Sequence, residues 1–165
     1  EFVISIPTIT LDASGNAAAG DQSTENKTAE PSTLDELFGG ENLSVTYTGA
    51  EIAANYMEGG YYSLDAEQGK TFVIVGIDIT NSGADEIAID NFAKTPKFSV
   101  MVNGQEKAEE ENTILPSDFA LYQETVPAGV TENTILLFQV PDSVTSVDSL
   151  DLFVNISGTN YQITL

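Results

Sequence analysis

Residues 72–80 read FVIVGIDIT, the longest strand-like stretch in the chain. Every second residue from Val73 to Ile79 is β-branched and apolar, which is the period of a strand with a buried face. Phe72 and Ile74 make the opposite face apolar as well. Because an antiparallel strand with one wet face alternates apolar and polar residues, we expect both faces of this strand to be covered.

The same alternation recurs on both sides of this stretch, in residues 43–47, 98–102, 136–140, 150–156 and 161–165. Asn103-Gly104 is the strongest hairpin signal, and Gly158-Thr159 marks a second turn. Pro116 interrupts residues 114–122, which we expect to form an edge strand or a loop. About eight short strands separated by turns are typical of an antiparallel β-sandwich, so the sequence predicts an all-β fold for residues 34–165.

One short helix is predicted at the start of this domain, where residues 33–40 read TLDELFGG. Thr33 is a suitable N-cap, and Glu36 three residues later completes a capping box. Gly39 is expected to end the helix in the left-handed conformation.

Two of the predicted strands have an apolar second face, formed by Phe72 and Ile74 on one and by Ile135 and Leu137 on the other. We expect these four residues to act as an acceptor face for a covering element. The candidates are the N-terminal arm, the helix at residues 34–38 and a partner subunit.

Residues 1–11, EFVISIPTITL, form a further predicted strand, the arm, with no partner nearby in the sequence. The polar residues 12–33 follow as a flexible linker, whereas a hairpin would return within two to five residues. As a random coil this linker spans roughly 25 Å, and about 70 Å when fully stretched, so it reaches its own domain or a neighbour. We therefore expect a donated assembly strand, whose burial would gain on the order of 10 kcal/mol before ordering costs. Its apolar residues are Phe2, Ile4, Ile6, Ile9 and Leu11.

The composition excludes several functions. With 26 acidic residues against 5 lysines, the formal charge is −21, which repels phosphate backbones, so nucleic-acid binding is not expected. No apolar run reaches the length of a membrane span, so insertion by this chain is not expected either. The start lacks the basic residues of a secretory signal, and an exported protein of this sequence would be the mature form.

The chain also lacks histidine, cysteine and arginine, which removes the triads, imidazole ligands and guanidinium clamps of most enzymes. We predict a non-enzyme without a cofactor, with calcium as the one metal that the acidic composition suits. The denser acidic patches lie at residues 85–90, 109–111 and 142–151, but none has the spacing of a known calcium loop.

Tyr56, Tyr61 and Tyr62 flank a glycine-containing loop that could meet a sugar or a partner, although tyrosine is also an ordinary strand residue. Weak glycosylation signals occur at Asn26, Asn42 and Asn155.

A family resemblance is carried by GKTFVIV at 69–75 leading to ITN at 79–81, then VPAG at 126–129 and LFQVP at 137–141. These motifs, in this order, resemble the uncharacterised immunoglobulin-like domains of secreted and lipid-anchored proteins of Gram-positive bacteria. The resemblance implies an immunoglobulin-like sandwich, a place outside the cytoplasm and no known catalysis. The lipid-attachment cysteine of that family is absent from this sequence, and the arm is not part of its pattern.

Two functional hypotheses follow for an extracellular, cell-surface protein. In the first, which we expect from the sequence, the chain is a structural subunit that polymerises head to tail by donating residues 1–11 to another copy of itself, a plan that resembles donor-strand filaments. In the second, it is a monomeric surface or secreted binding or spacer module whose arm lies on its own sheet. A third possibility is that residues 1–11 are the last strand of an upstream domain.

Overall fold

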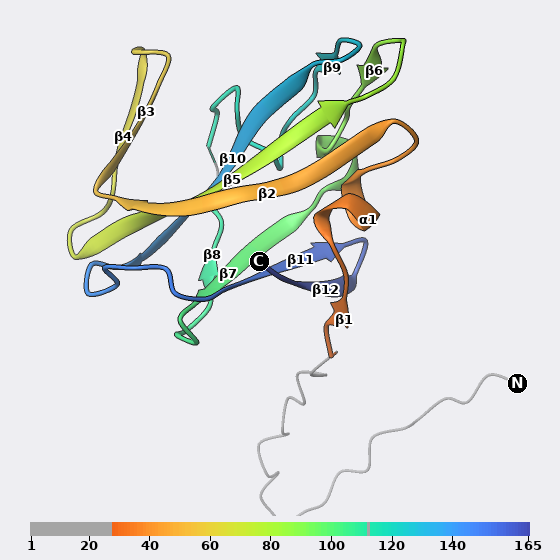
Figure 1. The fold of residues 1–165 in the computed structure, drawn as a ribbon. Coiled ribbons are helices and arrows are strands. Elements are labelled where there is room, and N and C mark those ends of the chain that lie inside the picture. The colour runs from red at the N-terminus through yellow and green to blue at the C-terminus, as the bar shows by residue number, and fades with distance from the viewer. Residues whose placement is uncertain (1–27, 112) are drawn as a thin grey trace, which may run out of the picture.

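The computed structural model describes residues 28–111 and 113–165. The predicted assembly strand, with Phe2, Ile4, Ile6, Ile9 and Leu11, lies outside the described residues, as do residues 12–27 of the expected linker. The described residues form an all-β sandwich with one short helix, as the sequence predicts (Figure 1).

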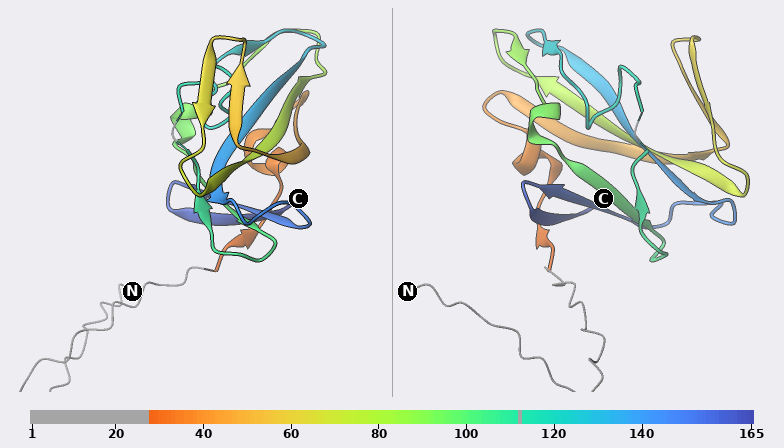
Figure 2. Two further views of the ribbon diagram at one scale, coloured as in Figure 1. Left: turned by 90° about the vertical axis from the view of Figure 1, so that its left-hand side faces the viewer. Right: turned by 180° about the vertical axis from the view of Figure 1, so that it is seen from behind.

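Two sheets make the sandwich, and they lie one above the other in Figures 1 and 2. The first sheet has the order β10-β5-β2, with β2 at Leu43–Ala53, β5 at Lys70–Asn81 and β10 at Thr131–Pro141. The second has the order β1-β12-β11-β7-β8. Its strands are β1 (Glu30–Pro31), β7 (Lys97–Val102), β8 (Ala108–Glu109), β11 (Leu150–Ile156) and β12 (Thr159–Thr164).

Two small ribbons and two helical turns complete the fold. The ribbons are β3 (Asn55–Glu58) with β4 (Tyr62–Asp65), and β6 (Ile87–Ala88) with β9 (Thr125–Val126). The helical turns are α1 (Leu34–Phe38) and the 3₁₀ turn η1 (Phe92–Lys94). All strand pairs are antiparallel except β1 with β12.

The core lies between the two sheets, and β5 is its central strand. Every second residue of β5 from Val73 to Ile79 is at most 1% exposed, which confirms the buried face predicted for residues 72–80. Facing them, β7 contributes Phe98, Val100 and Val102, which are also buried. Phe98 packs with Phe38 of α1 and with Phe119, at ring-centroid distances of 5.8 and 6.0 Å. The helix therefore closes one end of this core.

The capping box at the start of α1 is confirmed. Thr33 Oγ1 accepts from the backbone N–H of Glu36, and the Glu36 carboxylate accepts from the N–H of Thr33. The predicted left-handed end is wrong, because Gly39 is extended, with φ −77° and ψ −172°. Glycine is needed there for space, since a Cβ would lie 2.5 Å from both the backbone oxygen and Oδ1 of Asp35. Asp35 Oδ1 accepts from the N–H of Val45 and so fixes the helix to β2.

The folded domain begins before residue 34, the predicted start. Glu30 and Pro31 form β1, which pairs in parallel with Tyr161 and Gln162 of β12. The N–H of Ser32 continues this contact by donating to the backbone oxygen of Gln162. The end of the expected linker is thus part of the sheet and covers the edge of β12.

The β3–β4 hairpin covers part of the outer face of the first sheet, where the sequence predicts an aromatic loop. Its Tyr56 and Leu64 pack against the second apolar cluster, which consists of Phe72, Ile74, Leu115 and Leu137. The expectation that the helix is a candidate cover for this face is wrong, because Leu34 and Phe38 of α1 belong to the core between the sheets.

Residues 110–111 and 113–122 run along the free side of β10. Glu110 bridges to Phe138 and Asp118 to Ile135, and the N–H of Phe119 donates to the backbone oxygen of Ile135. The segment holds Phe119 and Tyr122 in the core, so the interruption at Pro116 marks a loop that protects a sheet edge.

Candidate functional site

The outer face of the second sheet is the candidate functional site. Phe98, Val100, Leu152 and Val154 point into the core, so their neighbours along β7 and β11 point outward. Strand pairing places these outward residues in rows: Lys97 beside Asn155 and Asn160, and Ser99 beside Phe153 and Gln162. The sheet thus presents a flat array of mainly polar side chains around one aromatic ring.

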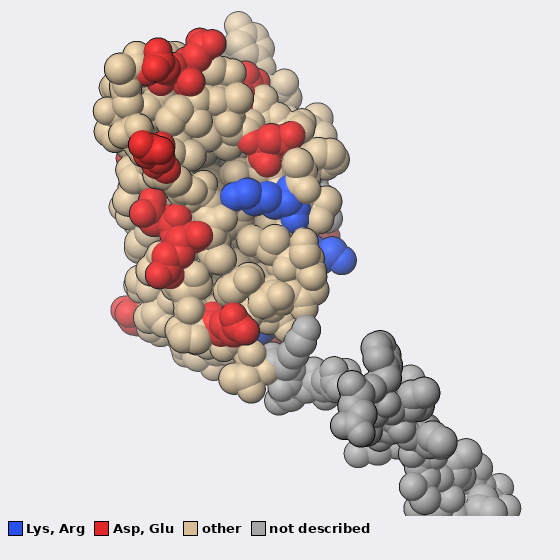
Figure 3. All heavy atoms as spheres, turned by 90° about the vertical axis from the view of Figure 1, so that its right-hand side faces the viewer, with Lys and Arg blue, Asp and Glu red and all other residues tan. Residues whose placement is uncertain are grey.

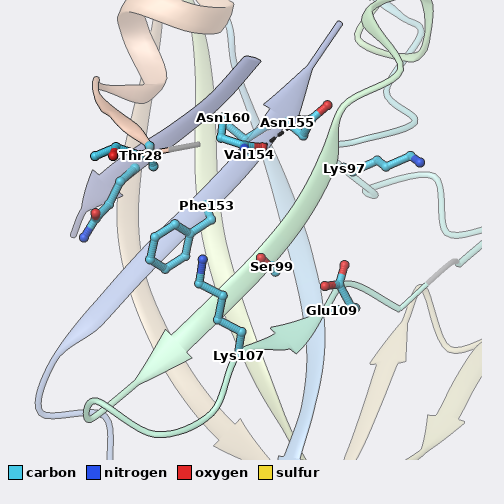
Figure 4. Close-up of a pocket in the computed structure, with 11 residues that line it drawn as sticks. Thr28, Lys97, Ser99, Lys107, Glu109, Phe153, Val154, Asn155 and Asn160 are labelled. Atoms are coloured by element: carbon cyan, nitrogen blue, oxygen red, sulfur yellow. Dashed lines mark hydrogen bonds between the residues drawn. The ribbon is translucent and has the colours of Figure 1, made fainter. Parts of the chain in front are cut away.

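These residues line a hollow of about 700 Å³, which we call the sheet-face hollow (Figure 4). The lining residues are Thr28, Ala29, Lys97, Ser99, Lys107, Glu109, Phe153, Val154, Asn155, Asn160 and Gln162.

Lys107 and Phe153 form the centre of the hollow. The Lys107 ammonium lies 3.3 Å from the centroid of the Phe153 ring, a cation–π contact that holds a charge over the sheet. Figure 4 shows Lys107 rising beside this ring, with Ser99 next to it on β7. Lys97 lies at the rim and extends away from the ring in the same view.

Amide side chains occupy one end of the hollow. Asn155 Nδ2 donates to Asn160 Oδ1 at 2.6 Å, across the β11–β12 hairpin. Asn155 Oδ1 accepts from the N–H of Gly158 in the turn of that hairpin. These bonds fix the orientation of both amides, so their remaining hydrogen-bonding atoms are presented in a set direction.

The charge of the hollow differs from that of the chain. Two lysines, Lys97 and Lys107, face a single acid, Glu109, in a chain with a formal charge of −21. Acidic side chains are spread in several groups over the face shown in Figure 3. The lining of the sheet-face hollow thus carries a net positive charge in an acidic chain.

The predicted acceptor face is largely occupied by the chain itself. Phe72, Ile74 and Leu137 are at most 6% exposed beneath the β3–β4 hairpin and Leu115. Ile135 is half-buried at the edge of this cluster. The hairpin is fixed there by Ser117, whose Oγ donates to Glu58 Oε2 at 2.5 Å.

A smaller hollow of about 340 Å³ remains beside this hairpin. Ile74, Gly76 and Ile135 form part of its lining, together with Gly49 and Tyr56. The predicted acceptor residues Ile74 and Ile135 therefore line this outer hollow, whereas Phe72 and Leu137 are not among its lining residues.

The other sequence-based candidates are not brought together. Residues 28–111 and 113–165 contain no group of three or more acidic side chains placed to hold a metal ion. Asn42 is exposed, Asn155 is bonded within its hairpin, and Asn26 lies outside the described residues. Of the aromatic residues at the tip of the β3–β4 hairpin, Tyr61 is 93% exposed.

One pair of carboxyls lies close together, with Asp118 buried and Glu110 half-buried. Their side chains are hydrogen-bonded to each other, and Asp118 also accepts from Thr113 Oγ1 at 2.5 Å and from the N–H of Ala120. Burial, together with the nearby charge of Asp118, raises the pKa of Glu110 to about 9. In glycosidases the two catalytic carboxyl groups are about 5 Å or more apart, whereas Glu110 and Asp118 are in direct contact. Neither residue lines the sheet-face hollow or the smaller hollow beside the β3–β4 hairpin.

Within the described part of the chain, no helix is long and apolar enough to cross a membrane. The protein is thus a β-sandwich, and its candidate polar site lies on the outer face of the second sheet.

No protein-family model matches the sequence, and a search of curated proteins finds no match. The family resemblance of the motifs is therefore not supported by a family model.

Several solved structures are similar at low identity. An uncharacterized β-sandwich protein from Clostridium difficile 630 is 18% identical, with a TM-score of 0.47 over 76% of this chain and 87% of that one. The yjhA protein from Bacillus subtilis is 15% identical, with a TM-score of 0.42 over 75% and 92%. A "putative lipoprotein" from Bacillus subtilis is 11% identical, with a TM-score of 0.40 over 74% of this chain and 36% of that one. These likenesses carry no information about the function of this chain.

Proposed function

We propose that this chain is a non-enzymatic β-sandwich module that works outside the cytoplasm, at a cell surface or after secretion, and binds a partner through the sheet-face hollow. The observation that carries the proposal is the arrangement at that hollow. An aromatic ring, oriented amides and two lysines are gathered there on a rigid sheet. A few placed polar groups around an aromatic side chain on a rigid support are typical of binding sites.

Binding accounts for this site better than catalysis does. The sequence lacks histidine, cysteine and arginine, so the common nucleophile–base pairs are excluded. The pair Glu110 and Asp118 is linked through a direct hydrogen bond and lies outside the hollow. The sheet-face hollow itself contains a single carboxylate, Glu109, whereas carboxylate-based hydrolysis needs two.

A place outside the cytoplasm is supported by the motifs at 69–81, 126–129 and 137–141, which resemble those of surface immunoglobulin-like domains. The charge of −21 is compatible with it, because it keeps the protein soluble and away from nucleic acids.

An array of polysaccharides and peptides, probed with the full chain, tests the proposal. Phe153→Thr removes the central ring while keeping a residue that favours strands. Tyr61→Thr is the matched control, because it removes an exposed aromatic ring from the β3–β4 hairpin instead. We expect binding to at least one class of ligand that is lost with Phe153→Thr and retained with Tyr61→Thr. Absence of binding to every ligand, or loss with Tyr61→Thr alone, would contradict the proposal.

A second candidate function is self-assembly through residues 1–11, and the edge of β2 favours it. Among the described residues, β5 is the one strand that pairs with β2, which is eleven residues long. The hollow beside β2 offers the apolar residues Ile74 and Ile135 to an added strand. Two features oppose strand addition here: the irregularity between Tyr47 and Gly49 disturbs the edge, and Asp35 already accepts from the N–H of Val45.

Sedimentation velocity over a range of concentrations separates the two functions. Assembly predicts oligomers of the full chain that disappear when residues 1–11 are deleted. A full chain that remains monomeric at high concentration rules out assembly and leaves the binding module.

A further inference from the structure

We propose that the sheet-face hollow binds an anionic polysaccharide, whose acidic groups pair with Lys97 and Lys107. This inference rests on the proposed binding function and adds the chemical class of the ligand.

The lysines of the chain are few, and their placement is uneven. Residues 28–165 contain four lysines, and two of them line this one hollow. Lys94 has a structural role, because its ammonium donates to the backbone oxygen of Leu37 at 2.9 Å and lies over the Phe38 ring. The hollow is thus positive on balance in an acidic protein, and such complementarity selects an anionic partner.

The two lysines present their charges differently. The cation–π contact with Phe153 orients the Lys107 ammonium over the sheet without neutralising its charge. Lys97 reaches outward from the rim, one row further along β7 (Figure 4). Two separated cations suit acidic groups repeated along a chain better than they suit a single small anion.

The remaining polar groups favour a sugar chain over an acidic peptide. Asn155, Asn160 and Gln162 offer amides in adjacent positions, which match the hydroxyl groups of a saccharide. An extended peptide usually gains affinity by pairing its backbone with an open sheet edge. In this sheet β1 pairs with Tyr161 and Gln162 in the middle of β12, and β8 pairs with Ser99 and Val100 of β7 on the other side, so the central part of each edge is already paired. The face therefore offers a ligand side chains rather than free backbone groups.

The overall charge also limits how acidic the ligand is. Double-stranded nucleic acid carries about one negative charge per 1.7 Å of its axis. A protein with a formal charge of −21 and two lysines in the site does not attract such a densely charged ligand. A polysaccharide with one acidic group per sugar is less densely charged. At physiological salt the screening length is about 8 Å, so acids beyond that distance are largely screened from a ligand in the hollow.

Fluorescence anisotropy with end-labelled oligomers tests the inference on the full chain. The probes are an octamer of galacturonic acid, its fully methyl-esterified form, which has the same sugars without charge, and an octamer of glutamic acid. We expect the galacturonic acid octamer to bind more tightly than either of the other two.

Three variants locate the binding. The double variant Lys97→Gln with Lys107→Gln is expected to weaken binding of the acidic sugar octamer by about tenfold, as two exposed ion pairs would. Lys70→Gln makes the same type of change outside the sheet-face hollow, in a neighbouring hollow that Lys107 and Glu109 also line, and should leave the affinity within about twofold. Glu109→Gln removes the one acid of the hollow and should tighten binding by about twofold.

The outcomes separate this inference from the proposed function. Equal affinity for the methyl ester overturns the assignment of an anionic ligand, and tighter binding of the glutamate octamer overturns the assignment of a sugar. In both cases the binding module stands if Phe153→Thr abolishes that binding. An affinity that does not change in the double lysine variant, or no binding of the acidic sugar, also overturns the inference, and the array then decides the proposed function by itself.

Discussion

The side chains of Glu110 and Asp118 are hydrogen-bonded to each other, although both carry carboxyl groups. Burial raises the pKa of both, and the charge of Asp118 raises that of Glu110 further, to about 9. At neutral pH Glu110 therefore keeps its proton and donates it in the hydrogen bond, with Asp118 as the acceptor. This bond links the end of β8 to the loop that covers β10, so the loop depends on a bound proton.

Stability is expected to decrease as the pH rises. The ordinary pKa of Glu110 is 4.5, so between about pH 4.5 and pH 9 the folded state binds a proton that the unfolded state has released. The stabilisation is fully present below pH 4.5 and is lost as the pH rises through about 9. Urea unfolding at pH 5, 7 and 9 should show a falling free energy of unfolding across this range.

Glu110→Gln tests the origin of this pH dependence, because an amide donates to Asp118 without a titrating proton. The variant should show a flatter dependence of stability on pH than the wild type. Glu109→Gln is the control, since it makes the same change at an exposed neighbour and should leave the slope unchanged. Equal slopes in the wild type and Glu110→Gln would refute the role of the pair.

Leu115 and Ile114 are neighbours in the same loop with opposite environments, 5% and 85% exposed. Leu115→Ala should destabilise the protein by about 2–4 kcal/mol, because it leaves a cavity above Phe72 and Leu137. Ile114→Ala should change the free energy of unfolding by no more than about 0.5 kcal/mol. Urea unfolding of both variants measures the difference, and similar values would mean that this loop does not cover the second apolar cluster.

Asn81 is fully buried at the end of β5 and links three segments. Its Nδ2 donates to the backbone oxygens of Asp85 and Val126, and its Oδ1 accepts from the N–H of Gly83. Asn81→Ala leaves these groups without partners and should cost about 2–4 kcal/mol. Asn55 of β3 is exposed and is the control, and Asn55→Ala should stay within about 0.5 kcal/mol in thermal or urea unfolding. A loss of less than 1 kcal/mol in Asn81→Ala would contradict this structural role.

The regular strands could be predicted from the sequence because their signal is local. The alternation in residues 72–80 and 98–102 gave both the strand type and the buried face, and β5 and β7 confirm them. The start of α1 was predictable for the same reason, since the Thr33–Glu36 capping box acts over three residues. The end of α1 could not be predicted from the sequence. The conformation of Gly39 depends on the close approach of Asp35, whose side chain is held by its hydrogen bond to β2.

The cover over the second apolar face depends on long-range contacts. Residues 55–65 read as a loop because the two strands of the hairpin are four residues each and lack a clear alternation. Their stability comes from packing of Tyr56 and Leu64 on the outer cluster and from the bond between Ser117 and Glu58. The bond between Ser117 and Glu58 joins residues 59 positions apart, and such a contact leaves no local pattern in a single sequence.

The sheet-face hollow was missed for a similar reason, since its residues come from four strands and their flanks. One signal was present: Phe153 lies between Leu152 and Val154 and breaks the alternation of β11, which places a large aromatic residue on the outer face. The second signal was the closeness of Lys97 and Lys107 in a chain with only five lysines.

The most direct test of the binding proposal is an amide chemical-shift map of the ¹⁵N-labelled full chain, titrated with the ligand that binds most strongly on the array. The largest shifts are predicted at the outward residues of β7, β11 and β12, around Ser99, Phe153 and Gln162. If the largest shifts instead lie along β2 and the β3–β4 hairpin, with none on the sheet face, the proposed site is wrong.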